Sequence, residues 1–353
     1  MNNTRVTEED LVKALQYQCR QNCNGLHVIG IQDTTEYNYN HHKKRLKEES
    51  LGIVGNNRDV GYFAHVMIAF DAVRCLPQGI SYCKLWSRTP QGEKRGKRNY
   101  KSLPIEDKES YRWIEAADQT RSLLDTAKHF TFLSDRESDI YQLWDRVPDE
   151  KTDFIIRARG DRPVFDEEAT VFETLQQSPV AGSYSIELKE DKRARRSKRT
   201  AVLQVRYAEI AIKKPRKTAT DHVRENHVAL RVVEAREIPG KNNQDEALVH
   251  WVLFTTHGVN DFDQARRIID WYAFRWQIEQ FFRLTKTKGI DLESSQLETG
   301  EGLKKLGLLG FATSLRALQL SLARDGIVND HVQKYFNSQE VIVLHVLDKE
   351  LKG

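Results

Sequence analysis

The sequence predicts an α/β protein built on a mixed sheet that is antiparallel at first and carries helices on its faces. Three apolar runs come first, at Leu26 to Thr34, Gly61 to Ala72 and Gly79 to Trp86, and they suit neighbouring antiparallel strands. Two later runs, Phe130 to Ser134 and Asp153 to Arg159, alternate with helical segments, as parallel strands with crossover helices do.

Helical spacing of apolar residues appears in three segments of the first half. The first 22 residues place Leu11 and Leu15 on one face, and a second helix is expected from Glu106 to Lys128. A third is expected from Glu137 to Trp144 and ends before Pro148. Residues 36–60 are polar and basic, and we expect a loop there.

The second half changes character between residues 162 and 256. Short alternating stretches are separated by charged turns, which predicts a β-rich insertion. The predicted strands are Ser183 to Leu188, Ala201 to Tyr207, Ala229 to Val233 and Leu248 to Phe254. A long helix without glycine or proline follows from Asp261 to Lys288, and another is expected from Gly302 to Arg324.

These elements divide the chain into five parts. We expect a short N-terminal helical segment, the first part of a catalytic core, a β-rich insertion domain, the last part of the core, and a C-terminal tail. Their ranges are 1–25, 26–161, 162–256, 257–325 and 326–353.

Composition limits the class of protein. Charged residues make up 30% of the chain and no long apolar run is evident, which argues against a membrane-spanning helix. Met1 to Asp10 is polar and lacks an apolar signal region, so a cytoplasmic protein is expected. The four cysteines have no CxxC spacing and no histidine cluster completes a zinc set, so they are expected to be reduced thiols.

The basic residues are grouped. The formal net charge is only +4, but four clusters of lysine and arginine punctuate the chain, and together they favour a polyanionic partner. Any one of them could equally be a solvated face. The clusters are Lys43, Lys44, Arg45 and Lys47; Lys94, Arg95, Lys97 and Arg98; Lys192, Arg193, Arg195, Arg196, Lys198 and Arg199; and Lys213, Lys214, Arg216 and Lys217.

Two aspartates stand where catalytic acids would be expected. Asp33 and Asp135 each follow a short apolar run, and acids at strand ends reach the edge of a sheet where ligands bind. Either residue could instead terminate a strand in a turn or cap a helix. Metal-dependent phosphodiester cleavage needs such carboxylates, because two divalent cations must be held about 3.5–4 Å apart.

The long predicted helix carries a polar stripe. At about 100° per residue, Tyr272, Arg275, Glu279 and Lys286 fall within about 60° of one another. Such a stripe could face solvent, but the remaining faces are rich in aromatic and aliphatic residues. A largely enclosed helix would turn the stripe into a cleft, which suits a metal-binding carboxylate flanked by phosphate-binding cations.

These motifs resemble a known enzyme family. The spacing Y-x2-R-x3-E-x6-K in the helix, Gln-Asp-Thr-Thr at 32–35 and Ser-Asp-Arg-Glu-Ser-Asp at 134–139 resemble the signatures of bacterial insertion-sequence transposases of the Tn-five (IS-four) type, a branch of the DDE transposases. Asp135 and Glu279 are 144 positions apart, which leaves room for the β-strand insertion that this family carries. The resemblance covers roughly residues 26–322.

The resemblance implies a ribonuclease H-like fold and a specific site. Asp33, Asp135 and Glu279 would be the catalytic, metal-binding triad for two Mg²⁺ ions, for which Mn²⁺ can substitute. The other signature residues, Tyr272, Arg275 and Lys286, would contact double-stranded transposon-end DNA, and the protein would act as a homodimer on transposon ends and target DNA, with no membrane partner. Excision in the family passes through a DNA hairpin, and Trp251 stands where a tryptophan would stack on the flipped base.

Several alternatives stay open. Trp251 could be an ordinary core tryptophan, and Asp139 is expected to be a helix partner rather than a metal ligand. Only 32 residues precede Asp33, whereas full-length members carry a helical DNA-recognition region there. The chain could therefore be a truncated element with impaired end recognition, or equally a short variant that uses its basic clusters instead. The competing functions are a non-catalytic DNA-binding remnant and a ribonuclease H-like nuclease without strand transfer.

Overall fold

The computed structural model describes most of the chain. The described residues are 3–47, 51–89, 103–165, 167–190, 197–215, 226–240, 247–286, 289–324 and 336–352. The second basic cluster, at 94–98, and most of the third and fourth clusters lie outside these ranges.

The sheet begins with antiparallel strands. Strand β1 (His27–Asn38) pairs with β3 (Asp59–Asp71), and β3 pairs on its other side with β4 (Pro77–Trp86) and with the short β2 (Gly52–Val54). All but two residues of β3 are buried, as expected of a central strand whose two faces are both covered.

Two parallel strands extend the sheet beyond β1. Strand β5 (His129–Ser134) pairs in parallel with β1, and β6 (Thr152–Arg157) pairs in parallel with β5. The crossover connections carry α2 (Arg112–Leu123) and α3 (Tyr141–Arg146). The predicted α/β fold class, a mixed sheet flanked by helices, is confirmed.

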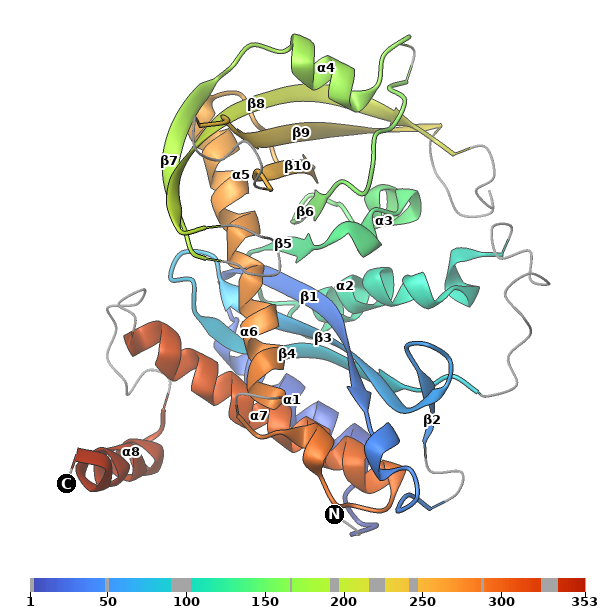
Figure 1. Ribbon diagram of the computed structural model, residues 1–353, viewed down its shortest axis with the longest axis vertical. Coiled ribbons are helices and arrows are strands. Elements are labelled where there is room, and N and C mark those ends of the chain that lie inside the picture. The colour runs from blue at the N-terminus through green and yellow to red at the C-terminus, as the bar shows by residue number, and fades with distance from the viewer. Residues whose placement is uncertain are drawn as a thin grey trace.

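The β-rich segment continues the same sheet. It contains β7 (Gly182–Leu188), β8 (Arg199–Lys213), β9 (His227–Glu237) and β10 (His250–Thr255), all antiparallel to their neighbours. Because β10 also pairs with β6, ten strands form one sheet, which curves over α5 (Figure 1). The β-rich character at 162–256 is thus present, while its status as a separate domain stays a prediction.

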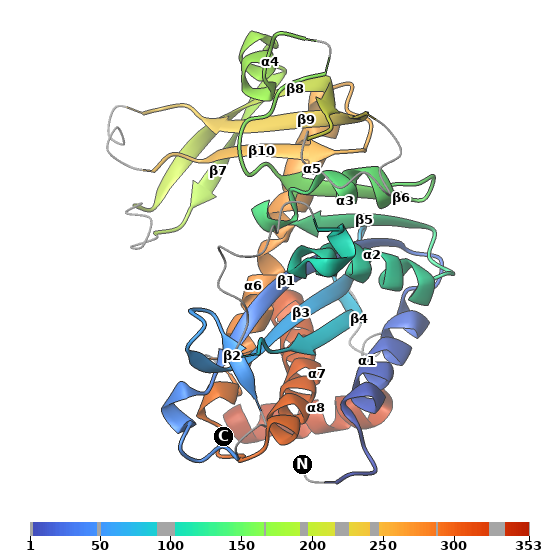
Figure 2. The same ribbon diagram turned by 90° about the vertical axis from the view of Figure 1, so that its right-hand side faces the viewer.

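Helices cover both faces of this sheet, and the remaining elements are short. The other helices are α1 (Glu8–Asn22), α4 (Val171–Gln177), α5 (Phe262–Phe274), α6 (Trp276–Thr285), α7 (Gly300–Arg324) and α8 (Ser338–Lys352). Single 3₁₀ turns occur at Asn40–His42, Ile105–Asp107, Glu109–Tyr111, Arg136–Ser138 and Leu292–Ser294. Figure 2 shows α7 and α1 beside the antiparallel end of the sheet.

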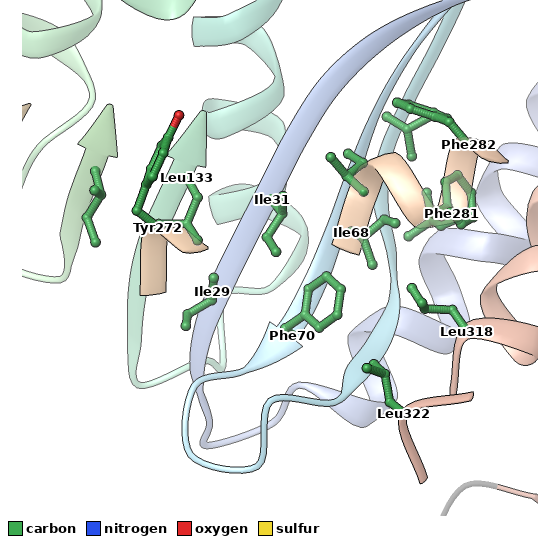
Figure 3. Close-up of a cluster of buried hydrophobic side chains, with 14 of the residues drawn as sticks. Ile29, Ile31, Ile68, Phe70, Leu133, Tyr272, Phe281, Phe282, Leu318 and Leu322 are labelled. Carbon is green, nitrogen blue, oxygen red and sulfur yellow. The ribbon is translucent and has the colours of Figure 1, made fainter. Parts of the chain in front are cut away.

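The core is divided between the two faces of the sheet. On one face, Ile29 and Ile31 of β1 and Phe70 of β3 pack toward α5, α6 and α7, where Phe281 and Leu318 meet them (Figure 3). The opposite face packs against α2, α3 and α4 through Trp113, Trp144 and Leu175, respectively. Helices α5 and α6, which carry Tyr272 and Glu279, lie on the first of these two faces.

The predicted helix over 261–288 is wrong in one respect, because the chain bends at Arg275. Helix α5 packs along β6, β8 and β9, whereas α6 packs on β1 and α7. The junction is a tight turn in which the Arg275 N–H donates to the Tyr272 carbonyl oxygen at 3.0 Å. A straight helix could not follow both parts of a twisted sheet, so the bend is imposed by packing rather than by glycine or proline.

Three other boundaries differ from the sequence-based expectation. Strand β1 continues to Asn38 and β2 lies at 52–54, so residues 36–60 are not all loop. The helix predicted over 106–128 is two 3₁₀ turns followed by α2, and the one over 137–144 is a 3₁₀ turn followed by α3. Strand pairing with β3 prolongs β1 beyond the point where its apolar residues stop.

Helix α7 corrects the expectation that no helix could span a membrane. It is long and apolar enough by length and composition, and it is the only such helix among the described residues. Half of its apolar stretch is buried inside the protein, where α7 contacts α1, α6 and β4. This is the pattern of a core helix, whose apolar residues face the protein interior.

Candidate active site

Three carboxylates from distant segments meet above one end of the parallel strands. The last registered pair between β1 and β5 is Ile31 with Leu133, and Asp33 and Asp135 each lie two residues further on. Because side chains alternate along a strand, Asp33 shares the face of Ile31, the face that α6 covers. Helix α6 places Glu279 over this same face, at hydrogen-bonding distance from Arg275, which also contacts Asp33.

Asp33 is not at the end of its strand, as the sequence suggested. It is a mid-strand residue of β1, where parallel pairing with β5 stops and antiparallel pairing with β3 continues to Asn38. The end of β5 therefore opens one side of β1 beside Asp33, and Asp135 occupies the position just past that end. The Asp33 carboxylate therefore lies where the neighbouring strand β5 ends, not where β1 itself ends.

Arg275 links two of the three acids. Its guanidinium lies 3.2 Å from the Asp33 carboxylate and donates a hydrogen bond to Glu279. The Asp33 and Arg275 side chains are largely buried, with 20% and 14% exposed, whereas Glu279 is 34% exposed. One guanidinium thus pairs with two of the three carboxylates in a partly desolvated site.

The pKa values of two of these acids are raised. The pKa of Asp33 is raised to about 7, first by burial and then by the Asp135 carboxylate, while the Arg275 cation and the Thr34 N–H oppose the rise. The pKa of Glu279 is also raised, first by burial and opposed by Arg275, with Asp135 adding to the rise. Asp33 and Glu279 thus both lie close enough to Asp135 for its carboxylate to act on them as a like charge.

Asp135 also caps a turn, a structural role that its place after an apolar run allows. Its side chain accepts a hydrogen bond from the Glu137 N–H at 2.8 Å, at the start of the 136–138 turn. Capping uses one carboxylate oxygen, Oδ1, and fixes the side chain at the end of β5. Asp139 is buried and accepts hydrogen bonds from the Arg159 N–H at 2.7 Å and from Arg162, so its expected role as a partner of a helix stays a prediction.

Tyr272 and Trp251 extend the site toward the β-rich segment. Tyr272 is buried, and its raised pKa reflects burial first, with Arg275 and Arg157 opposing and Asp135 adding to the rise. Trp251 of β10 is half-buried and packs edge-to-face on Tyr272, with ring centroids 5.3 Å apart. Trp251 is therefore neither a fully buried core residue nor isolated from the carboxylates.

Lys286 departs from the predicted stripe. Helix α6 ends at Thr285, and Lys286 has non-helical backbone angles, so the angular argument does not extend to it. Its ammonium lies 5.3 Å from the centre of the Tyr37 ring, four residues beyond Asp33 in β1. The structure thus brings Arg275 and Glu279 together with the aspartates and places Lys286 farther along β1.

A hollow of about 850 Å³ adjoins the carboxylates. Thr34 and Arg136, the residues that follow Asp33 and Asp135, both line it. The remaining lining residues are Thr35, Glu36, Phe63, Trp86, Arg88, Glu109, Ser110, Arg112, Trp113, Glu137 and Arg159. The four arginines give a surface suited to phosphates, and Trp86 is the one half-buried aromatic ring among these lining residues.

Arg112 is a site residue that the sequence did not mark. Its guanidinium donates to the Thr34 hydroxyl at 2.9 Å and to the Glu137 carboxylate at 2.7 Å. It thereby joins the segment after Asp33 to the segment after Asp135. Nothing in its sequence surroundings distinguishes it from other surface arginines, because its partners lie 78 and 25 positions away.

Comparison with known proteins adds one likeness. No family model matches the chain. A solved structure described as the piggyBac transposase synaptic complex with hairpin DNA is similar over 96% of this chain and 56% of that chain, with 12% sequence identity and a TM-score of 0.45. The chain thus spans little more than half the length of that protein.

Proposed function

We propose that this protein is a DDE transposase of the bacterial insertion-sequence type, which cleaves and joins DNA with divalent metal ions. The observation that carries the proposal is the convergence of Asp33, Asp135 and Glu279. They come from β1, the end of β5 and α6, and up to 246 residues separate them in the chain. Their order and surroundings agree with the Y-x2-R-x3-E-x6-K resemblance.

The donor set fits hard divalent cations. Carboxylate oxygens are the ligands that Mg²⁺ prefers, and in two of the three acids burial, with a contribution from Asp135, raises the pKa. Asp33, Asp135 and Glu279 would hold two Mg²⁺ or Mn²⁺ ions, which supply activation of the attacking oxygen and stabilisation of the leaving oxygen.

The cationic and aromatic side chains would position the DNA. We propose that Arg275 and Tyr272 contact the backbone phosphates near the cut, and that Lys286 contacts the strand farther along. Half-buried beside Tyr272, Trp251 offers one ring face to an extruded base. The arginines of the adjoining hollow other than Arg112 would hold the flanking backbone.

The proposed reaction needs no protein nucleophile. A water oxygen attacks a phosphorus at the end of the element, which breaks the P–O3′ bond and frees a 3′-hydroxyl. That hydroxyl attacks the opposite strand and closes a hairpin. After a second water opens the hairpin, the same hydroxyl joins to target DNA. Each step exchanges one P–O bond for another. We expect a homodimer that pairs two ends, acting in the cytoplasm on nucleoid DNA.

Incubation of the full chain with flanking inverted-repeat DNA and Mn²⁺ tests this proposal. The expected products on a denaturing gel are excised hairpin ends. Asp33→Ala, Asp135→Ala and Glu279→Ala should each lower cleavage by at least about 10³-fold while DNA affinity persists. Asp270→Ala is the matched control, because Asp270 is an exposed acid on α5 that pairs with Arg266.

The outcomes separate the competing functions. Full cleavage by any of the three triad variants refutes the assignment. Nicks without hairpins or joined products identify a nuclease without strand transfer. DNA binding without Mg²⁺ or Mn²⁺ uptake in calorimetry identifies a non-catalytic remnant.

A further inference from the structure

A second cluster of metal-binding side chains lies at the opposite edge of the sheet. His129 opens β5, Asp153 lies in β6, and His257 follows β10. The Asp153 Oδ2 atom is 2.8 Å from His129 Nε2 and 3.2 Å from His257 Nδ1, and all three atoms lie within 4.8 Å of one another. Since Asp135 lies six residues along from His129, at about 3.3 Å per residue, this cluster is about 20 Å from the triad.

The surroundings hold these groups in place. The Thr131 hydroxyl is 2.9 Å from His257 Nε2 and 2.8 Å from Nε2 of a third histidine, His27. The Trp271 ring packs against both His27 and His257, with centroids 5.4 Å and 5.3 Å away. The imidazoles are thus oriented by groups that do not compete for the Asp153 carboxylate, as histidine ligands usually are.

Two imidazole nitrogens face one carboxylate oxygen. His129 Nε2 is hydrogen-bonded to Asp153 Oδ2 at 2.8 Å, and His257 Nδ1 lies 3.2 Å from the same oxygen. Ring nitrogens of neutral imidazole are the usual metal ligands of histidine, so the two rings and the carboxylate present their ligand atoms to one point.

We propose that His129, Asp153 and His257 form a binding site for one Zn²⁺ ion. Bonds of about 2.0–2.2 Å in a tetrahedral arrangement place ligand atoms about 3.3–3.6 Å apart. Two of the present separations are 2.8 Å and 3.2 Å and the third is at most 4.8 Å, so small side-chain rotations would bring the three atoms onto one ion. Two imidazoles and one carboxylate favour Zn²⁺ over Mg²⁺, which prefers oxygen ligands. A fourth position remains for water.

The site would fasten the start of α5 to the sheet. His257 belongs to the segment between β10 and α5, while His129 and Asp153 belong to two core strands. Helix α5 carries Tyr272 in its last turn and leads into Arg275. A bound ion would therefore cross-link the β10–α5 connection to β5 and β6, and stabilise the helix that carries part of the candidate active site.

Calorimetry with Zn²⁺ alone tests the proposal on the full chain after chelator treatment. The Asp33→Ala/Glu279→Ala background removes the carboxylate site, so this result does not depend on whether the protein is a transposase. We expect one equivalent of Zn²⁺ with a Kd of about 1 μM or tighter, and no comparable uptake of Mg²⁺. Zn²⁺ should also raise the Tm.

Single-residue variants test which side chains bind the Zn²⁺ ion. His129→Ala and His257→Ala should each weaken Zn²⁺ binding at least about a hundredfold, whereas His41→Ala, at an exposed histidine, should leave it unchanged. If an alanine variant fails to fold, two further measurements test the site. These are Zn²⁺ binding by His257→Gln, and the visible spectrum of Co²⁺ bound to the Asp33→Ala/Glu279→Ala protein that keeps all three proposed ligands. A strong tetrahedral absorption supports the site. Absent Zn²⁺ binding, a weak octahedral spectrum, or binding that survives His257→Ala overturns it.

Discussion

At the scale of single residues, the candidate active site is a place where charge is concentrated at the expense of stability. Asp33 is buried beside Asp135 and Glu279, and Arg275 supplies the cation that contacts Asp33 directly. Catalytic sites often keep such like-charged groups together because bound metal ions later neutralise them. The cost of this arrangement in the metal-free protein can be measured.

The raised pKa of Asp33 predicts a stability that falls as pH rises. The folded pKa, about 7, exceeds the ordinary value of 3.8, so the folded protein holds a proton that the unfolded chain releases between these two pH values. Asp33 therefore favours the folded state most below pH 3.8. Its contribution to the free energy of unfolding is lost as the pH rises from 3.8 through about 7. Asp33→Asn should raise the free energy of unfolding by roughly 1–3 kcal/mol at pH 8 and by much less at pH 4.

Urea unfolding with a chelator present, at pH 4 and pH 8, measures this difference. Asp270→Asn, at an exposed position, should change stability by no more than about 0.5 kcal/mol at either pH. An Asp33→Asn variant that is less stable than the unaltered protein at pH 8 would contradict the electrostatic description of the site.

The contacts of Arg112 predict that its replacement lowers the rate of DNA cleavage without weakening DNA binding. Its guanidinium bridges Thr34 and Glu137, a geometry that a lysine ammonium cannot reproduce. Arg112→Lys should therefore lower the cleavage rate about tenfold through misplacement of the two aspartate segments, with little change in the Kd for DNA. Arg121→Lys is the matched control, since Arg121 lies on the same helix but bridges Asp118 and Asp149. Equal effects of the two changes would show that Arg112 has no positioning role.

At the scale of elements, close packing fixes where the helices lie. Helix α1 approaches β4 so closely at Gly79 that an added Cβ would lie 2.4 Å from the Cβ and 2.5 Å from the Cα of Cys19. Neither atom can move without moving α1. A glycine is therefore required there by the close approach of two backbones.

Gly79→Ala should lower the free energy of unfolding by about 1–3 kcal/mol, because the added methyl group must displace α1 or β4. Gly160→Ala is the control, because no atom lies within 4 Å of its added Cβ. Chemical denaturation of both variants provides the measurement. A Gly79→Ala protein as stable as the Gly160→Ala protein would mean that α1 is not seated on β4 as described.

At the scale of the whole molecule, one sheet joins the core to the β-rich segment. The connection between β6 and β10 is short, with three registered pairs from Leu253 to Thr255. It is reinforced on the side of α3, where Phe254 packs on Trp144 with ring centroids 5.2 Å apart. The two halves should therefore unfold together.

Phe254→Ala should lower the free energy of unfolding by about 3–5 kcal/mol, because it leaves a cavity at the junction of β10 and α3. Tryptophan fluorescence and far-ultraviolet circular dichroism should shift to the same lower denaturant midpoint. Two separated transitions in the variant would indicate that the β-rich segment unfolds independently, and would support the division into domains at 162–256.

The sequence alone determined the order of elements and the identity of the chemically important residues. Apolar periodicity located nine of the ten strands, since alternation reflects which face of a strand is buried. The resemblance singled out Asp33, Asp135, Glu279, Tyr272 and Arg275, and the structure brings these residues together. Their catalytic and DNA-binding roles stay predictions that the proposed experiments address.

Only the tertiary structure decided how distant segments meet. It showed that Asp33 lies within β1 rather than at its end, that the helix bends at Arg275, and that Arg112 joins two distant segments. It also brought His129 and His257 to Asp153, although the sequence shows no histidine cluster. Local spacing records only contacts along one element, whereas these contacts arise from strand pairing and helix packing between residues far apart in the chain.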